Sequence, residues 1–356
     1  MAKQLFGIFS PIMGERKDYP TILLEKTVQV DNQNIIRKYG EVHRRQMRDP
    51  DMLDTSDNKY QTPDTYPIIH FHTFTKRSTA TQYVLAFTKA HIYVWNPSTK
   101  VWDSKFTCSA DCVEWDTTSY NDKVIATNNV DKVLVWDTTG NFVALDDVTN
   151  GIEYAAGVYL TKAKYVTTFE NFLILGYTYE NSVSHPQRIR WNAIGDETSW
   201  DSGDAGSAET EGSDFITGFN IYSGQLVIFK EKPRILQRLV ATSAVWNWDK
   251  MPGNIGGISN HSIVEDTDGR VYWLASDMTF REMQTGEISS AIDPIVKLIE
   301  PSSDYLVYGA YIDETGEIWW SIPHQNALNN KIITYKNGTW GELEIATPAI
   351  SVYKEA

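Results

Sequence analysis

The segments Tyr83–Trp102 (YVLAFTKAHIYVWNPSTKVW) and Lys123–Phe142 (KVIATNNVDKVLVWDTTGNF) follow one pattern. Each has an apolar strand, then a second strand that ends in Val-Trp-Asn or Val-Trp-Asp, then a polar turn and an aromatic residue. Short runs rich in Val, Ile, Tyr, Phe, Trp and Thr that alternate with turn residues are typical of antiparallel strands joined by hairpins. The pattern recurs along the chain, which indicates an all-β fold built from one repeated unit.

Six complete repeats can be aligned. They begin near Ile68, Cys112, Leu160, Asp214, His261 and Tyr305. Their spacing of about 44 to 54 residues matches the length of a four-stranded propeller blade. We therefore predict a β-propeller of four-stranded antiparallel blades with little helix, for which Ile288–Ser302 is the best candidate. A large β-sandwich or barrel is the alternative, although neither requires units of such similar length.

The two ends of the chain are expected to close the ring. Thr21–Gln46 has the pattern of a hairpin that turns at Asp31–Asn34, and the last residues from Ala349 supply one further strand. An open first or last sheet leaves backbone groups unpaired, so pairing of this hairpin with the last strand predicts a composite seventh blade. Six blades without it are the alternative.

The predicted domain organisation is an N-terminal arm, residues 1–20, followed by a single propeller domain, residues 21–356. Within the propeller, the polar segments 48–67 and 195–214 are expected to be long exposed loops. Long loops in compact domains are usually functional or disordered. We expect these two loops and the arm to contact partner proteins.

Composition and charge exclude several classes of protein. The chain has 356 residues, of which 42% are hydrophobic and 12% aromatic, so it has ample material for a packed interior. Its 32 basic and 46 acidic side chains give a net charge of −14, which disfavours tight binding to nucleic acid and to anionic membranes. No run of about 18 apolar residues is present, and residues 1–20 lack the features of a secretory signal. We expect a protein made in a reducing cytosol without membrane contact.

The two cysteines and one histidine pair are candidate metal ligands. Extended chain between Cys108 and Cys112 would place their sulfur atoms about 13 Å apart, so buried free thiols are expected rather than a disulfide. His70 and His72 share one face of a strand, a geometry compatible with one metal ion. A site would need a third ligand, which the sequence does not place, so hydrogen bonding within the sheet is the expected role of both histidines.

The second of the two long loops, 195–214, is acidic and is a candidate calcium site. The loop offers oxygen ligands from Asp201, Asp204, Glu209, Glu211 and Asp214. Their spacing does not match that of an EF-hand, so a solvated loop is expected. The sequence has no Gly-x-Ser-x-Gly, His-Glu-x-x-His or phosphate-binding Gly-rich motif. We predict no catalytic, cofactor-binding or metal site, and therefore no enzyme activity.

One stretch of sequence resembles a known family. The passage His185–Glu209 (HPQRIRWNAIGDETSWDSGDAGSAE), the strand Leu226–Glu231 (LVIFKE) and the N-terminal segment Ile35–Gly40 (IIRKYG) resemble the propeller-type structural proteins of tailed bacteriophages. Such proteins are found in tail nozzle or tail tubular assemblies and in related head-to-tail components of short-tailed virions. The resemblance covers most of Thr21–Leu343.

The resemblance implies a non-enzymatic virion structural protein of the tail or head-to-tail region, assembled in the host cytoplasm. The implied partners are further copies of the chain, in a homo-oligomeric ring, and neighbouring tail or neck proteins. A negative surface would suit a wall around a DNA conduit, because it repels the phosphates of the passing genome. A carbohydrate-binding propeller for host attachment is the alternative. A polysaccharide-degrading enzyme with a carboxylate pair near the central channel is a third hypothesis.

Overall fold

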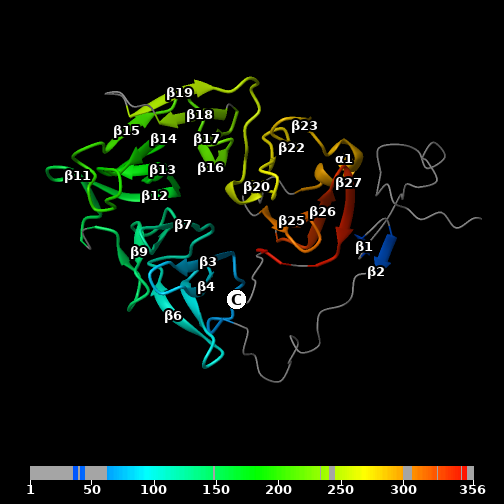
Figure 1. The fold of residues 1–356 in the computed structure, drawn as a ribbon, viewed down its shortest axis with the longest axis horizontal. Coiled ribbons are helices and arrows are strands. Elements are labelled where there is room, and N and C mark those ends of the chain that lie inside the picture. Colours follow the sequence, from blue (N-terminus) through cyan, green and yellow to red (C-terminus); the bar gives the residue numbers. More distant parts are fainter. Residues whose placement is uncertain are drawn as a thin grey trace, which may run out of the picture.

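The computed structural model places the backbone of two short strands, residues 35–38 and 41–44, and then that of 62–350. Residues 147–148, 233, 240–244, 300–306, 327 and 346 are outside the described part, and so are the side chains of 35–38, 41–44 and 234–239. The described chain is all-β. Its small antiparallel sheets are arranged in a ring, the architecture of a β-propeller (Figure 1).

Five of the sheets in the ring have four antiparallel strands, which follow one another in chain order. The first two sheets are β3 (His70–Lys76), β4 (Thr81–Phe87), β5 (His91–Asn96) and β6 (Val101–Thr107), and β7 (Asp116–Tyr120), β8 (Lys123–Thr127), β9 (Leu134–Trp136) and β10 (Val143–Ala144). The next is β16 (Ile216–Tyr222), β17 (Gln225–Lys230), β18 (Arg234–Leu239) and β19 (Trp246–Lys250). The last two are β20 (Val264–Glu265), β21 (Val271–Leu274), β22 (Phe280–Glu282) and β23 (Gly286–Glu287), and β24 (Tyr308–Ile312), β25 (Glu317–Ile322), β26 (Lys331–Lys336) and β27 (Thr339–Leu343).

The remaining sheet of the ring has five strands. They are β11 (Ile152–Ala155), β12 (Val158–Phe169), β13 (Phe172–Glu180), β14 (Val183–Trp191) and β15 (Gly206–Glu209). Strand β11 pairs only with Val158–Leu160 at the start of β12, whereas β13 pairs along almost the whole of β12.

The pattern of apolar residues follows the position of each strand within its sheet. Strands β8 and β17 lie in the interior of their sheets and are buried on both faces, because a neighbouring sheet covers each side. This is why they have continuous apolar runs such as LVIF. The outer strand β6 instead alternates between exposed and half-buried residues.

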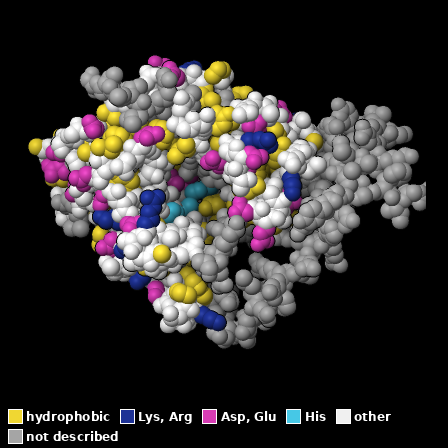
Figure 2. Space-filling view, viewed as in Figure 1, with side chains coloured by type: hydrophobic (Ala, Val, Ile, Leu, Met, Phe, Trp, Pro, Cys, Tyr) yellow, Lys and Arg dark blue, Asp and Glu magenta, His cyan; other side chains and the backbone are white. Residues whose placement is uncertain are grey.

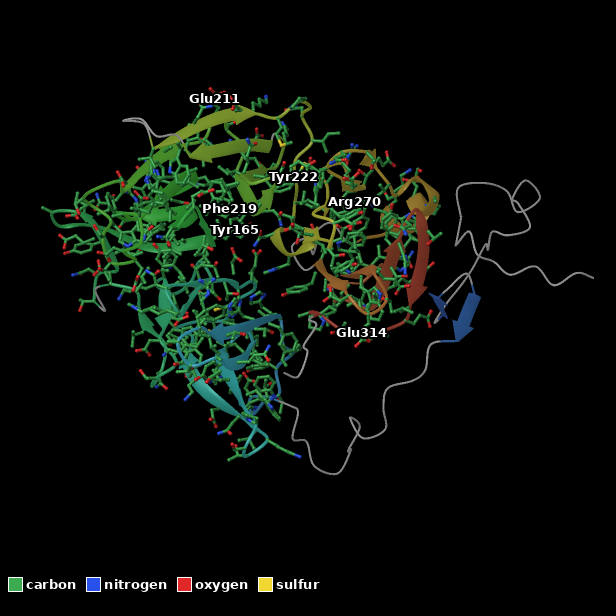
Figure 3. The ribbon with its side chains drawn as sticks, viewed as in Figure 1. Tyr165, Glu211, Phe219, Tyr222, Arg270 and Glu314 are labelled. Atoms are coloured by element: carbon green, nitrogen blue, oxygen red, sulfur yellow. The ribbon has the colours of Figure 1, made fainter. Side chains whose placement is uncertain are left out.

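Aromatic side chains fill the space between neighbouring sheets. Tyr165 on β12 and Phe219 on β16 meet edge to face, with ring centroids 6.4 Å apart (Figure 3). Gly176 on β13 makes room for this contact, because a Cβ atom there would lie 2.4 Å from the ring of Phe219.

Part of the predicted architecture is confirmed. The chain is an all-β propeller of small antiparallel sheets with very little helix. The count of six complete four-stranded repeats with a composite seventh blade is not confirmed: the repeat predicted near Leu160 corresponds to the five-stranded sheet. Of the predicted helix Ile288–Ser302, residues 300–302 lie outside the described residues, and the described part has two short turns, the 3₁₀ turn η4 (Ser290–Ile292) and α1 (Asp293–Val296).

The predicted N-terminal hairpin is described only in part. Strands β1 (Ile35–Lys38) and β2 (Glu41–Arg44) pair with each other, with Lys38 opposite Glu41, and the predicted turn Asp31–Asn34 lies outside the described residues. Among the described residues, these two strands form a separate two-stranded sheet. The arm 1–20 and residues 351–356 lie outside the described residues.

The predicted loop 195–214 is packed in part, which corrects the expectation that it is exposed throughout. Gly206–Glu209 form strand β15, and Trp200 is buried, donating its Nε1–H to the carbonyl of Glu197 at 2.7 Å. Of the other predicted loop, 48–67, residues 48–61 lie outside the described residues. The rest of it is anchored, since the Asp64 carboxylate accepts hydrogen bonds from Thr88. None of the helical turns in the described chain has the length and apolar character needed to traverse a bilayer.

Candidate functional site

The first strands of several sheets converge on the axis of the ring, where the structure gathers buried polar side chains. Figure 2 shows histidine side chains in the hollow at the centre of the ring. They come from β3 and from η3 (Asn260–Ser262), a short 3₁₀ turn that precedes β20. The axis of a propeller is a natural place for a site, because all blades contribute residues to it.

A chain of hydrogen bonds joins three sheets at the axis. The Tyr308 hydroxyl lies 2.9 Å from His70 Nδ1, and His70 Nε2 lies 2.7 Å from the Thr117 hydroxyl. The Thr117 hydroxyl is also 2.9 Å from His72 Nδ1, and His72 Nε2 is 3.0 Å from the Ser119 hydroxyl. Strands β24, β3 and β7 are thereby tied together through side chains.

When both histidines are neutral, every hydrogen bond in this series can form with the donors all pointing in one direction. Tyr308 donates to His70, His70 donates to Thr117, Thr117 donates to His72, and His72 donates to Ser119. Each neutral imidazole supplies one donor and one acceptor, so this direction requires the Nε2–H tautomer in both rings, and the reverse direction requires the Nδ1–H tautomer in both. A satisfied network of this kind, buried at His70 and reaching the surface at Ser119, fixes the relative positions of the strands that carry it.

The short turn η3 occupies the axis and contacts sheets on several sides. His261 stacks on Tyr308 with ring centroids 4.7 Å apart, and its Nε2 lies 2.6 Å from the Trp115 carbonyl oxygen. The Asn260 side-chain oxygen accepts a hydrogen bond from Phe219 N at 3.2 Å. The carbonyl of Ser262 accepts one from the indole of Trp320 at 2.9 Å. We call Asn260–Ser262 the axial plug.

Burial keeps the axial histidines neutral. It lowers the pKa of His70 well below the ordinary value, and the charges of His261 and His72 act in the same direction. Burial lowers the pKa of His72 to about 4 and also lowers the pKa of His261. The Tyr308 hydroxyl has its pKa raised by burial. At neutral pH these groups are therefore uncharged hydrogen-bonding partners.

Asp116 on β7 is a buried carboxyl group beside the plug. Burial raises its pKa to about 7, although hydrogen bonds from Val166 N, Thr117 N and the Asn260 side chain favour the charged form. The nearby carboxylate of Glu114 raises the pKa of Asp116 further. Asp116 links β7 to β12 and to the plug, and its proton is exchangeable near neutral pH.

A cavity of about 680 Å³ is lined by hairpin turns of successive sheets. Its lining includes Phe74, Arg77, Asp122, Glu170 and Ile221. The Asp122 carboxylate accepts hydrogen bonds from the backbone N–H groups of Arg77 at 2.8 Å and Ser78 at 2.9 Å, which lower its pKa. The general acid of a glycosidase needs a raised pKa, so Asp122 suits a structural acceptor better than that catalytic role.

The structure assigns a role to the histidines singled out in the sequence. His70 and His72 are hydrogen-bonded, as expected, but to β7 and β24 of the adjacent sheets and not within their own sheet. Of the acidic loop residues, Glu209, Glu211 and Asp214 line one pocket, and Asp201 and Asp204 do not line it. Glu209 also pairs with Arg188 at 2.6 Å. In the part of the chain that the structure describes, the one group of three or more His, Cys, Asp or Glu side chains with metal-site spacing is Cys108, Cys112 and Asp131.

The cysteines themselves require a correction. Their sulfur atoms lie within 4.8 Å of each other and not about 13 Å apart, because residues 108–115 turn between two sheets instead of forming a strand. Both thiols are free, as predicted; Cys112 is buried and Cys108 is half-buried.

The residues that carry the family resemblance hold one sheet together. The Glu180 carboxylate is almost fully buried and accepts hydrogen bonds from Arg190 Nε at 3.0 Å, Arg190 Nη2 at 2.9 Å and Arg188 Nη1 at 2.8 Å. These bonds outweigh the desolvation of Glu180 and lower its pKa to about 2. The Arg190 guanidinium also stacks on Tyr154 at 3.6 Å. The Arg-Ile-Arg-Trp passage is therefore a structural motif in this chain.

Sequence reasoning missed His261 and Tyr308 as axial residues. A predicted repeat begins near His261, and Tyr308 follows closely on Tyr305, near which the next predicted repeat begins. That position was the available signal, because the start of a propeller repeat enters the ring at its centre. Sequence alone could not show that residues 70, 261 and 308 meet.

Comparisons with known proteins add similarity of fold alone. The chain matches no protein-family model, and no curated protein sequence matches it. It is similar to the crystal structure of a computationally designed protein, Ika8, with a TM-score of 0.44 and 12% identity over 81% of this chain and 78% of that one. It is also similar to the extracellular domain of a putative hybrid two-component system, BT4673 from B. thetaiotaomicron, with a TM-score of 0.45 and 11% identity over 74% of this chain and 33% of that one.

Proposed function

We propose that this chain is a non-enzymatic structural protein of a tailed bacteriophage virion, located in the tail or head-to-tail region, that acts by assembling with copies of itself and with neighbouring tail or neck proteins. The observation that carries the proposal is that the polar side chains at the axis are engaged in hydrogen bonds within the protein. His70, His72, His261 and Tyr308 bond to one another or to neighbouring strands, which makes the centre of the ring a rigid joint. A rigid disc is what a virion wall needs.

The DNA conduit of this proposal lies between copies of the chain and not along the axis of one propeller. His70 and His261 lie 4.8 Å apart at the axis, and His261 stacks on Tyr308. These contacts leave no room for a duplex inside one propeller. The net charge of −14 supports a non-adhesive wall, since acidic surfaces repel DNA phosphates.

We also propose that the ring contains six blades. The five-stranded sheet is a sixth blade, made of β12–β15, with β11 as an added strand at the start of β12. The limited pairing of β11 supports this division. The first and last blades are joined directly by the bond between Tyr308 and His70, 238 positions apart in sequence, which closes the ring through side chains.

The test is the mass of the purified chain in solution, followed by its localisation in particles. Light scattering after size-exclusion chromatography is expected to show a closed oligomer, or a monomer that enters a stable complex with tail or neck proteins of the same phage. Cryo-EM of intact particles should then place the chain in the tail or neck. The proposal would be overturned if the chain is a monomer that does not bind those proteins and is absent from the particle.

A second candidate function, carbohydrate binding for host attachment, is favoured by one observation. A pocket of about 420 Å³ beside β15 and β19 combines one aromatic side chain, Trp248, with carboxylates and amides suited to sugar hydroxyls. Its polar lining includes Glu209, Glu211, Asp214 and Asn254. Glycan-array binding that is lost in Trp248→Ala and kept in Trp102→Ala, which lies on the first blade, would establish this function. No binding by the unmodified chain would exclude it.

A further inference from the structure

A cluster of soft and hard metal ligands that the axial hydrogen-bond network does not include lies where the first blade joins the second. Cys108 follows the last strand of the first blade, Cys112 lies in the connecting turn, and Asp131 lies between β8 and β9 of the second blade. One ligand atom from each of the three residues can be chosen so that all lie within 4.8 Å of one another. The chain distance between Cys112 and Asp131 shows that the fold, and not local sequence, assembles the group.

The dimensions suit a thiophilic divalent cation. A tetrahedral zinc ion with Zn–S bonds of about 2.3 Å places two sulfur atoms about 3.8 Å apart. The upper limit of 4.8 Å on the separation of the two sulfur atoms lies only about 1 Å above this value. Two thiolates and one carboxylate are a zinc ligand set, and three protein ligands leave a fourth position for water. Cys108 is half-buried, which leaves the ion access from solvent.

The surrounding residues already orient the ligands. The buried side chain of Asn128 donates from Nδ2 to Cys112 Sγ at 3.0 Å and to the Asp131 carboxylate at 3.0 Å. The other carboxylate oxygen of Asp131 accepts from Ser109 N at 3.1 Å. Hydrogen bonds of this kind, from residues next to the ligands, fix ligand orientation in metal sites.

The backbone of both cysteines is also fixed. Cys108 N donates to the carbonyl of Ala90 and Cys112 N to that of Lys89, each at 2.8 Å. Both acceptors belong to the turn between β4 and β5 of the first blade. The two sulfur atoms are therefore held on one rigid turn, with Asp131 brought to them from the second blade.

We propose that Cys108, Cys112 and Asp131 bind one Zn²⁺ ion, which cross-links the connector between the first two blades to the β8–β9 turn. Binding replaces the two thiol protons with Zn–S bonds and releases both protons to solvent, so no oxidant or reductant is needed. The site is independent of the proposed assembly function.

The first experiment uses the full-length chain in reducing buffer. Metal-free protein is titrated with Zn²⁺ against a chromophoric chelator, and separately with Co²⁺. We expect one ion per chain, a sulfur-to-cobalt charge-transfer band, and a higher Tm in the presence of Zn²⁺. Absence of the charge-transfer band in the unmodified chain overturns the proposal without any variant.

Three variants test the ligand set. Cys108→Ser and Asp131→Asn should each weaken zinc binding at least tenfold, and Asn128→Ala should weaken it by about 10–100-fold through loss of ligand orientation. The matched control is Asp111→Asn. Asp111 lies between the two cysteines, but its carboxylate pairs with Lys89 at 2.8 Å instead of joining the cluster. Equal zinc affinity in Cys108→Ser and Asp111→Asn would overturn the assignment.

Discussion

At the scale of single residues, the structure shows why buried polar side chains occur in an otherwise apolar interior. His70, Thr117 and His72 each have a hydrogen-bonding partner on an adjacent strand, so their burial leaves no orphaned group among these ring and hydroxyl atoms. Burying a polar group costs little folding free energy when all of its hydrogen bonds are made. Removing one partner leaves the other without a hydrogen bond and lowers stability.

The Tyr308–His70 contact provides the first prediction. Tyr308→Phe removes the hydroxyl bonded to buried His70 Nδ1, and we expect the free energy of unfolding to fall by about 1–3 kcal/mol. Tyr311→Phe is the control, because its hydroxyl makes an exposed contact with Thr267. Urea unfolding measures both, and the control should change by less than about 0.5 kcal/mol. Equal losses of unfolding free energy in the two variants would show that the Tyr308–His70 hydrogen bond stabilises the fold no more than the exposed contact of Tyr311.

Asp116 provides a prediction about pH. Its pKa is raised to about 7 in the native state, against an ordinary value of 3.8, so the native chain keeps a proton that the unfolded chain releases. The stability contributed by this proton is present at low pH and is lost as the pH rises from about 4 to 7. Relative to Asp116→Asn, the unmodified chain should therefore lose roughly 2–4 kcal/mol between pH 4 and pH 8.

The control for Asp116 has the opposite sign. Asp137 is exposed, and hydrogen bonds from Thr139 lower its pKa. Relative to Asp137→Asn, the unmodified chain should lose stability as the pH falls below about 4. Denaturant titrations across this range measure both differences. A difference between the unmodified chain and Asp116→Asn that does not change with pH would contradict the assigned pKa.

At the scale of elements, close contact between chain segments decides which residues are allowed. The segment that leads from β19 to the axial plug runs against the end of β17, where Gly257 N donates to the Lys230 carbonyl at 3.0 Å. The Gly256 carbonyl accepts a bond from the Trp273 indole at 3.0 Å. Two successive glycines let the backbone lie against its neighbour at this point.

These glycines differ sharply in the space around them, which yields a matched pair of substitutions. A Cβ atom at Gly256 would lie 1.7 Å from the Lys230 carbonyl oxygen, whereas one at Gly257 would meet nothing closer than 3.4 Å. We expect Gly256→Ala to lower the free energy of unfolding by about 3 kcal/mol. Gly257→Ala should change it by less than about 1 kcal/mol. Thermal and urea unfolding test this, and a tolerated Gly256→Ala would disprove the close approach.

At the scale of the whole molecule, net charge and ring closure are the features that matter for assembly. The chain carries a net charge of −14, so copies of the chain repel one another electrostatically at low ionic strength. Among the described residues, strands β1 and β2 pair with each other and with no strand of the ring. The first and last sheets meet instead at His70 and Tyr308.

The charge predicts how self-assembly should depend on salt. Raising the ionic strength from 0.1 M to 1 M shortens the screening length from about 10 Å to about 3 Å. If copies form a ring, the oligomeric fraction at a fixed chain concentration should rise with salt. Light scattering at several salt concentrations measures this. Dissociation at high salt would show instead that ion pairs hold the copies together.

The sequence alone determined the all-β class, the repeat and the propeller architecture, because hairpin turns and alternating apolar strands are local patterns. It also showed that the chain has few candidates for catalysis. The turn at Cys108–Cys112 was predicted wrongly, because short connections are set by the strands that they join.

Only the tertiary structure decided which distant residues meet. His70, His261 and Tyr308 come together at the axis, and Asp131 reaches the two cysteines, through contacts between sheets that are far apart in sequence. Local periodicity fixes each strand, but ring geometry fixes the neighbours of its side chains. Burial at those meeting points, and not residue type, sets the protonation of His72 and Asp116.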